Sequence, residues 1–109
     1  MAIANVNGNL VEVNLQMTAV TGFRPDELLS LTIFNLVADP FLQQTFSMIS
    51  TMLTIRDGSQ PSRFDVQGKR RDGQPSGILS ISVVQDHMLR PKYFVICVRG
   101  APVPGRPYC

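Results

Sequence analysis

The sequence contains few of the residues from which catalytic and metal sites are built. It has no tryptophan, one histidine and two cysteines in 109 residues. Two cysteines cannot complete a structural zinc site without further ligands. The histidine, His87, follows Asp86 in a short polar segment, with no nucleophile or oxyanion-stabilising motif beside it in the sequence. We therefore expect His87 to be a solvated turn residue, and we predict no catalytic residue, no metal and no cofactor.

Charge of one sign and long apolar runs are also scarce. The formal net charge is +2, which is too small to indicate nucleic-acid binding. The basic run Lys69–Arg71 is followed by Asp72, and we interpret it as a solvated turn. No apolar run approaches the ~18 residues of a membrane-spanning helix, and the N-terminus lacks the basic and apolar regions of a secretory signal. We expect neither a nucleic-acid nor a membrane partner.

The two cysteines stand in different surroundings. Cys97 lies in an apolar, strand-like run, and Cys109 is the last residue. We interpret them as a small buried hydrophobic side chain and a tail thiol rather than as a disulfide. This interpretation fits a reducing compartment, so the chain is expected to be intracellular, either cytoplasmic or nuclear.

The composition that is present is that of a folded domain. Hydrophobic residues make up 44% of the chain and charged residues 17%, which is typical of a globular protein. The length suits one domain. Three prolines and a glycine fall within Ala101–Pro107, which is typical of a linker. We predict one domain over residues 1–100 and a Pro/Gly-rich C-terminal linker over residues 101–109.

The first third of the chain predicts a strand pair followed by short helices. A β-prone run over Ile3–Val6 precedes Asn7–Gly8, which favours a type I′ hairpin turn before a second strand over Leu10–Val13. Asn14 is a good N-cap for a helix over 15–21, which ends at Gly22. A second helix is expected behind Pro25, and a further turn or two over 32–37.

The middle of the chain predicts its longest helix. Asp39 is expected as the N-cap and Pro40 as the first helical residue. Apolar residues then recur at helical spacing and predict a buried stripe. The stripe consists of Leu42, Phe46, Ile49 and Leu53.

The C-terminal half changes to the alternation of strands. We predict strands over Arg63–Gln67, Gly77–Gln85 and Lys92–Arg99, joined by turns at Asp72–Gly73 and His87–Pro91, with a loop over 56–61 before them. Together with the N-terminal pair these strands predict a four- or five-stranded antiparallel sheet with helices inserted in the middle.

Several motifs in this order resemble a known family. Gly8 and Asn14 flank the second predicted strand, and Thr21–Phe23, Glu27–Leu29 and Arg71–Gly73 follow. Their sequence and spacing over residues 2–99 resemble those of PAS domains, which serve as sensors and interaction modules. The resemblance implies an α+β fold, with a five-stranded antiparallel sheet and short helices on one face. It also implies a non-catalytic regulatory domain of a signalling or transcription-regulating protein.

The cofactor-binding branches of the family are not matched. The flavin-binding branch carries a cysteine in a segment that corresponds to residues 31–37, and these residues include no cysteine. The haem-binding branch often has a histidine on the long helix, and residues 40–53 include no histidine. Met48 and Met52 on that helix are expected to fill the core rather than bind iron. The resemblance therefore implies no bound flavin or haem.

One face of the predicted sheet is expected to be an interface. Leu79, Ile81 and Val83 share one face of their strand, and the last strand is apolar on both faces. An antiparallel sheet usually shows polar residues to water on its outer face, so an apolar outer face predicts a cover, either a flanking helix or another protein chain. We expect a homo- or hetero-dimer through this face. Its candidate residues are Ile78, Ser80, Ser82, Val84, Tyr93, Val95 and Cys97.

The inner side of the sheet offers an alternative function, the binding of a small hydrophobic ligand between sheet and helices. A close-packed core without a cavity is the favoured interpretation, because the side chains there are large and no polar anchor is evident among them. The candidate lining residues are Leu28, Ile33, Leu36, Phe46, Ile49, Ile81 and Phe94.

Overall fold

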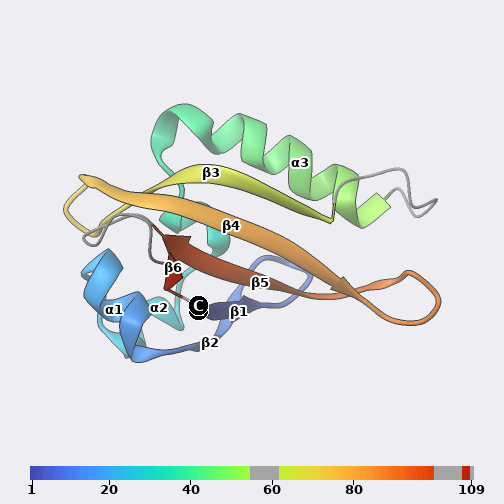
Figure 1. The fold of residues 1–109 in the computed structure, drawn as a ribbon, viewed down its shortest axis with the longest axis horizontal. Helices are drawn as coiled ribbons and strands as arrows, with labels where there is room; N and C mark the ends of the chain where they lie inside the picture. The colour runs from blue at the N-terminus through green and yellow to red at the C-terminus, as the bar shows by residue number, and fades with distance from the viewer. Residues whose placement is uncertain (55–61, 100–106, 109) are drawn as a thin grey trace.

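The computed structural model describes residues 1–54, 62–99 and 107–108. A single antiparallel sheet has the strand order β2-β1-β5-β4-β3, and the short strand β6 also pairs with β5 (Figure 1). The strands are β1 (Ala2–Ala4), β2 (Leu10–Val13), β3 (Arg63–Lys69), β4 (Pro75–Gln85), β5 (Pro91–Arg99) and β6 (Pro107–Tyr108). The predicted α+β class and five-stranded antiparallel sheet are confirmed. Residues 101–106 and 109 of the predicted linker lie outside the described residues. The whole of the predicted loop over 56–61 also lies outside them.

The first helix forms where its local signals predict it. Helix α1 spans Leu15–Thr21, and the side chain of its N-cap Asn14 accepts from the Met17 N–H at 3.1 Å. The chain leaves the helix through Gly22, which has a φ of 81° and donates its N–H to the Thr18 carbonyl. A glycine suits this position because a Cβ disfavours positive φ.

The turn between the first two strands differs from the prediction. A type I′ turn needs positive φ at both central residues, but among the described residues of this turn only Gly8 has it. The turn is instead organised by Asn5, whose side-chain oxygen accepts from the N–H groups of Asn7 and Asn9, each at 3.0 Å. The predicted hairpin is therefore correct, but its turn type is wrong.

The remaining helices are short except for one. Helix α2 spans Pro25–Leu28, the 3-10 helices η1 and η2 span Ile33–Leu36 and Asp39–Phe41, and α3 spans Leu42–Thr54. Asp39 is not the N-cap of α3, because the chain first makes η2, whose N-cap is Ala38. The Asp39 carboxylate instead pairs with the Lys69 ammonium at 2.7 Å. Among the described residues no helix is long and apolar enough to cross a membrane.

Helix α3 packs the predicted stripe against the core except at one position. Its buried residues are Thr45, Ile49 and Met52, whereas Phe46 is 63% exposed. Thr45 tolerates burial because its hydroxyl donates to the Phe41 carbonyl at 2.8 Å. Leu42 and Leu53 of the predicted stripe are partly buried against the core, so only the expected burial of Phe46 is wrong, and Thr45 is buried in its place.

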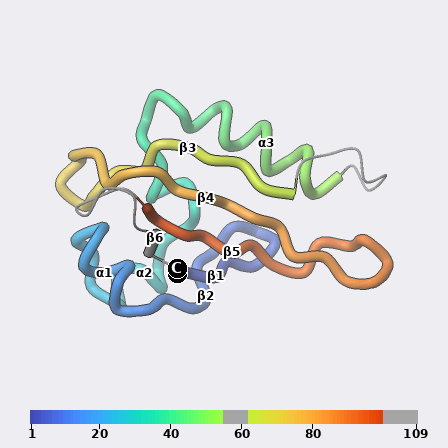
Figure 2. Tube along the Cα trace, viewed as in Figure 1, coloured from blue at the N-terminus to red at the C-terminus, as the bar shows by residue number. Residues whose placement is uncertain are grey.

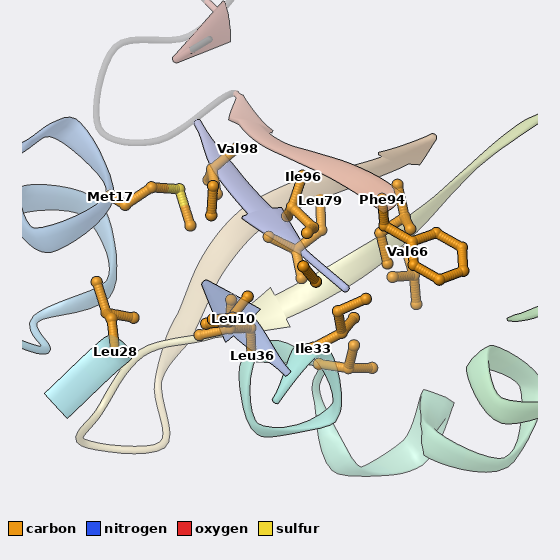
Figure 3. Close-up of a cluster of buried hydrophobic side chains, with 14 of the residues drawn as sticks. Leu10, Met17, Leu28, Ile33, Leu36, Val66, Leu79, Phe94, Ile96 and Val98 are labelled. Atoms are coloured by element: carbon orange, nitrogen blue, oxygen red, sulfur yellow. The ribbon is translucent and has the colours of Figure 1, made fainter. Parts of the chain in front are cut away.

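The core lies between the helices and one face of the sheet (Figure 3). Phe94, Ile96 and Val98 of β5 meet Leu79 and Ile81 of β4 there, all at 0% exposure. The helical segments close the core from the other side through Met17, Leu28, Ile33, Leu36 and Ile49. The apolar side chains of β5 that the sequence could not assign to a face are thus divided, with the even-numbered set inside.

Candidate functional site

The register of the strands defines the outer face of the sheet, which lies opposite the helices. Val95 of β5 pairs with Ile3 of β1 and Ser82 of β4, and Tyr93 pairs with Val84. Cross-strand partners point to the same face, and these alternate with the buried Phe94, Ile96 and Val98. The outer face therefore holds every residue of the predicted interface: Ile78, Ser80, Ser82, Val84, Tyr93, Val95 and Cys97.

One part of this face is apolar and partly accessible. Ile3, Val84, Tyr93 and Val95 are half-buried, and Ile78 is 38% exposed. Apart from Ile78, these residues lie on β1, β5 and the C-terminal half of β4. No helix of the described residues covers this face (Figure 1). Partial burial of several apolar side chains on one surface marks a position where a second surface can exclude water.

The other part of the face carries a charged cluster that sequence analysis missed. The carboxylate of Asp65 on β3 accepts from Ser80 Oγ at 2.8 Å and from Arg99 Nη2 at 2.6 Å, and Arg63 Nε lies 3.4 Å away. Arg99 reaches this carboxylate from β5 and so spans β4. The hydrogen bond from Ser80, together with the nearby guanidinium groups of Arg63 and Arg99, lowers the pKa of Asp65 against the opposing effect of partial burial.

The cluster changes the expected character of the interface. Ser80 is only 8% exposed because it lies under the Asp65–Arg99 pair, so its hydroxyl is occupied within the chain. The outer face is therefore mixed, with an apolar part beside a fixed polar one. The alternation in β3 already indicated that Arg63 and Asp65 share a face, but their meeting with Arg99 depends on the pairing of three strands.

Cys97 has a different chemical state from the one expected. It lies half-buried on the outer face and is disulfide-bonded. The expectation of a free thiol at Cys97 is therefore wrong. The other cysteine of the sequence, Cys109, lies outside the described residues.

The predicted ligand-binding residues lie in the core with one exception. Leu28, Ile33, Leu36, Ile81 and Phe94 are at 0% exposure and Ile49 at 5%, whereas Phe46 is on the surface with its ring 5.9 Å from that of Phe34. Surface pockets formed by the described residues include four with volumes between about 270 and 510 Å³, and none of the predicted residues lines any of these four.

The polar residues considered for chemistry are engaged in the structure of the turns. Lys69 pairs with Asp39, and Arg71 pairs with Glu27 at 2.9 Å. Arg70 lies 3.8 Å from Asp72. The backbone N–H of Arg24 lowers the pKa of Glu27, with a further contribution from Arg71, although desolvation opposes it. Within the described residues no group of histidine, cysteine and acidic side chains is arranged to hold a metal ion.

Comparison with known proteins identifies the fold. No protein-family model and no curated protein sequence matches the chain. Similar solved structures include a PAS domain from Desulfitobacterium hafniense, with 16% identity, a TM-score of 0.66 and coverage of 87% of this chain and 86% of that one. A domain of a sensor histidine kinase/response regulator from Geobacter sulfurreducens has 21% identity, a TM-score of 0.64 and coverage of 87% and 77%.

A third similar structure comes from a different kind of protein. The PAS domain of the fruit-fly ELK potassium channel has 14% identity, a TM-score of 0.62 and coverage of 87% of this chain and 80% of that one. The antiparallel sheet and the short helices between β2 and β3 are those that the sequence resemblance implied. From its N-terminal strand pair to its last long strand, the chain has the fold of a PAS domain.

Proposed function

We propose that this chain is a non-catalytic regulatory domain of a signalling or transcription-regulating protein, and that it dimerises or docks a partner through the outer face of its sheet. The observation that supports the proposal best is the partly accessible apolar surface of Ile3, Val84, Tyr93 and Val95. Domains of this fold in a sensor histidine kinase/response regulator and in a potassium channel support a role in signalling.

The two parts of the face have different roles in this proposal. Burial of the apolar part against a partner supplies the favourable free energy, at about 25 cal/mol per Å² of apolar surface removed from water. The Asp65 cluster supplies orientation, because its charges are held in fixed positions by Ser80 and Arg99. A partner surface with poorly matched charges is rejected, since like charges and unpaired buried charges are costly.

The experiment is the association state of the chain as a function of concentration. Val95→Lys places a charge in the middle of the apolar part, and Gln43→Lys on the exposed side of α3 adds the same charge elsewhere. We expect sedimentation equilibrium to show self-association for the parent and for Gln43→Lys, and a lower average mass for Val95→Lys at the same concentration. Identical masses for the parent and Val95→Lys at every concentration would contradict self-association through this face.

The alternative function, binding of a small hydrophobic ligand, has one observation in its favour. The Ser76 hydroxyl is buried, and among the described residues it has no hydrogen-bond partner. A polar group of a ligand could satisfy it. We place this alternative second, because the residues expected to line a cavity are buried in the core, except for Phe46, and none of them lines the pockets described above. Native mass spectrometry of the purified chain tests it, and the absence of any bound small molecule would count against it.

A further inference from the structure

The tip of the β4–β5 hairpin presents two apolar side chains to solvent. Met88 is 61% exposed and Leu89 is 43% exposed. The hairpin extends to one end of the molecule, and α1 and α2 lie toward the opposite end (Figure 2). The tip is fixed by Asp86, whose carboxylate accepts from the N–H groups of Met88 and Arg90 and from Arg90 Nε, at 2.8 to 2.9 Å. Met88 and Leu89 are therefore held outward by an ordered loop.

Neither the backbone nor the packing explains a leucine at position 89. Leu89 has a φ of 62° and is the one non-glycine residue with positive φ in the described part of the chain. This conformation favours glycine, asparagine or aspartate over a bulky side chain. The side chain also gains little from burial within the chain. A strained, exposed apolar residue is typical of a surface with a binding role.

The opposite end of the molecule carries a mostly apolar surface pocket beside α1. It has a volume of about 510 Å³ and is lined by Val13, Asn14, Leu15, Gln16 and Pro25. Leu15 is 78% exposed at the start of α1. This pocket, here named the α1 pocket, adjoins a second pocket that shares Val13 and Asn14 with it.

The charges around the two surfaces are complementary. Arg90 and Lys92 flank the hairpin tip, and the one acidic group of the loop, Asp86, is turned toward its backbone and Arg90. Glu12 lines the pocket that adjoins the α1 pocket, and Asp26 follows Pro25 with its side chain 73% exposed, sharing an ion pair with Arg24. Arg90 and Asp26 are each compensated by an ion pair within the chain, so the complementary charges are those of Lys92 beside the tip and Glu12 beside the pocket.

We propose that copies of this chain associate head to tail, with Met88 and Leu89 of one copy in the α1 pocket of the next. The contact is heterologous, because the two surfaces differ, and it leaves a free tip and a free pocket at the ends of every assembly that does not close into a ring. It is independent of the outer face of the sheet, where a dimer would be symmetric. Salt weakens the association, since part of the attraction is between exposed charges.

The test uses two substitutions that the fold tolerates. Leu89→Asp suits positive φ, and Leu15→Asp places a carboxylate in the first turn of α1, where it is favourable. Both are made together with Val95→Lys, which removes association through the sheet face. Equal melting temperatures by circular dichroism show that the variants remain folded.

Sedimentation equilibrium then decides the proposal. With Val95→Lys alone, we expect the mass to rise with concentration beyond that of a dimer. Leu89→Asp and Leu15→Asp should each weaken association at least about tenfold, whereas their equimolar mixture should form a dimer that grows no further, because one intact tip meets one intact pocket. A mixture no more associated than its components would overturn the proposal. A Val95→Lys variant that stays monomeric at every concentration would also overturn it.

A second measurement does not depend on these substitutions. Carbodiimide coupling of mixed ¹⁴N- and ¹⁵N-labelled chains should join Lys92 of one copy to Glu12 or Asp26 of another. Binding of monomeric chains to vesicles of anionic phospholipid, lost in Leu89→Asp, would assign the tip to a membrane and overturn self-association.

Discussion

Replacement of Gly68 by alanine should strongly destabilise the domain. Gly68 lies on β3 opposite Gly77, and an isolated bridge joins it to Val37 beside η1. A Cβ added there would lie 2.5 Å from Ser76 Oγ, 2.9 Å from Leu79 Cγ and 3.1 Å from the Leu36 carbonyl oxygen. The glycine is therefore required by the close approach of three neighbours.

The expected cost follows from how far each neighbour can move. The Ser76 hydroxyl can rotate, but Leu79 is fully buried and the Leu36 oxygen belongs to the backbone of η1. Overpacking of a closely packed core costs about 1–3 kcal/mol, and two neighbours that cannot yield place Gly68→Ala at about 2–3 kcal/mol. For a domain of this size, that lowers the melting temperature by roughly 10–20 °C.

The assay is urea unfolding followed by circular dichroism, with a double-mutant cycle. Ser76→Ala removes the atom nearest to the added Cβ together with a buried hydroxyl without a partner among the described residues. It should recover about 1 kcal/mol of the loss in the double variant. Gly73→Ala measures a backbone cost without a steric one, about 1–2 kcal/mol, because Gly73 has a φ of 88° and no atom within 4 Å of an added Cβ; Ser76→Ala should recover none of that loss. Equal unfolding free energies for Gly68→Ala and the parent would refute the reasoning.

Further predictions concern a helix cap, a helix face and acid stability. Asn14→Ala should lower stability by about 1 kcal/mol, because the first turn of α1 loses its N-cap, and Asn14→Asp should retain most of it. Ile49→Ala should cost about 2–4 kcal/mol, whereas Phe46→Ala on the exposed side of the same helix should cost less than about 1 kcal/mol by thermal unfolding. The Arg90 N–H lowers the pKa of Asp86, as the Ser80 hydroxyl does for Asp65. Their contributions are present above the unfolded-state pKa of about 4 and are lost as pH falls through the folded-state values. The melting temperature should thus drop on acidification below about pH 4, and less steeply in Asp65→Asn.

Local chemistry made the N-terminal helices predictable. The oxygen of Asn14, the free φ of Gly22 and the ring of Pro25 act on backbone groups within a few residues of themselves. Such signals are complete in the sequence, so α1 forms within its predicted limits. The alternation of β4 was equally local and correctly separated Leu79 and Ile81 from Ser80.

Residues whose environment depends on distant partners were not predictable in the same way. Thr45 rather than Phe46 is buried, because the orientation of α3 is fixed by the core it covers and the Thr45 hydroxyl is satisfied by its own helix. The outer face looked wholly apolar in β5, yet Arg99 crosses β4 to reach Asp65, 34 residues away in the sequence.

By itself, the sequence determined the kind and order of the elements and the antiparallel class of the sheet, because capping and alternation are short-range properties of the chain. The tertiary structure alone decided which apolar face of β5 became the core, where Asp65 found its partners, and that Met88 and Leu89 extend away from the pocket beside Leu15. These features depend on strand register and on packing across the sheet. A shift of one residue in the register of a strand would exchange its inner and outer side chains.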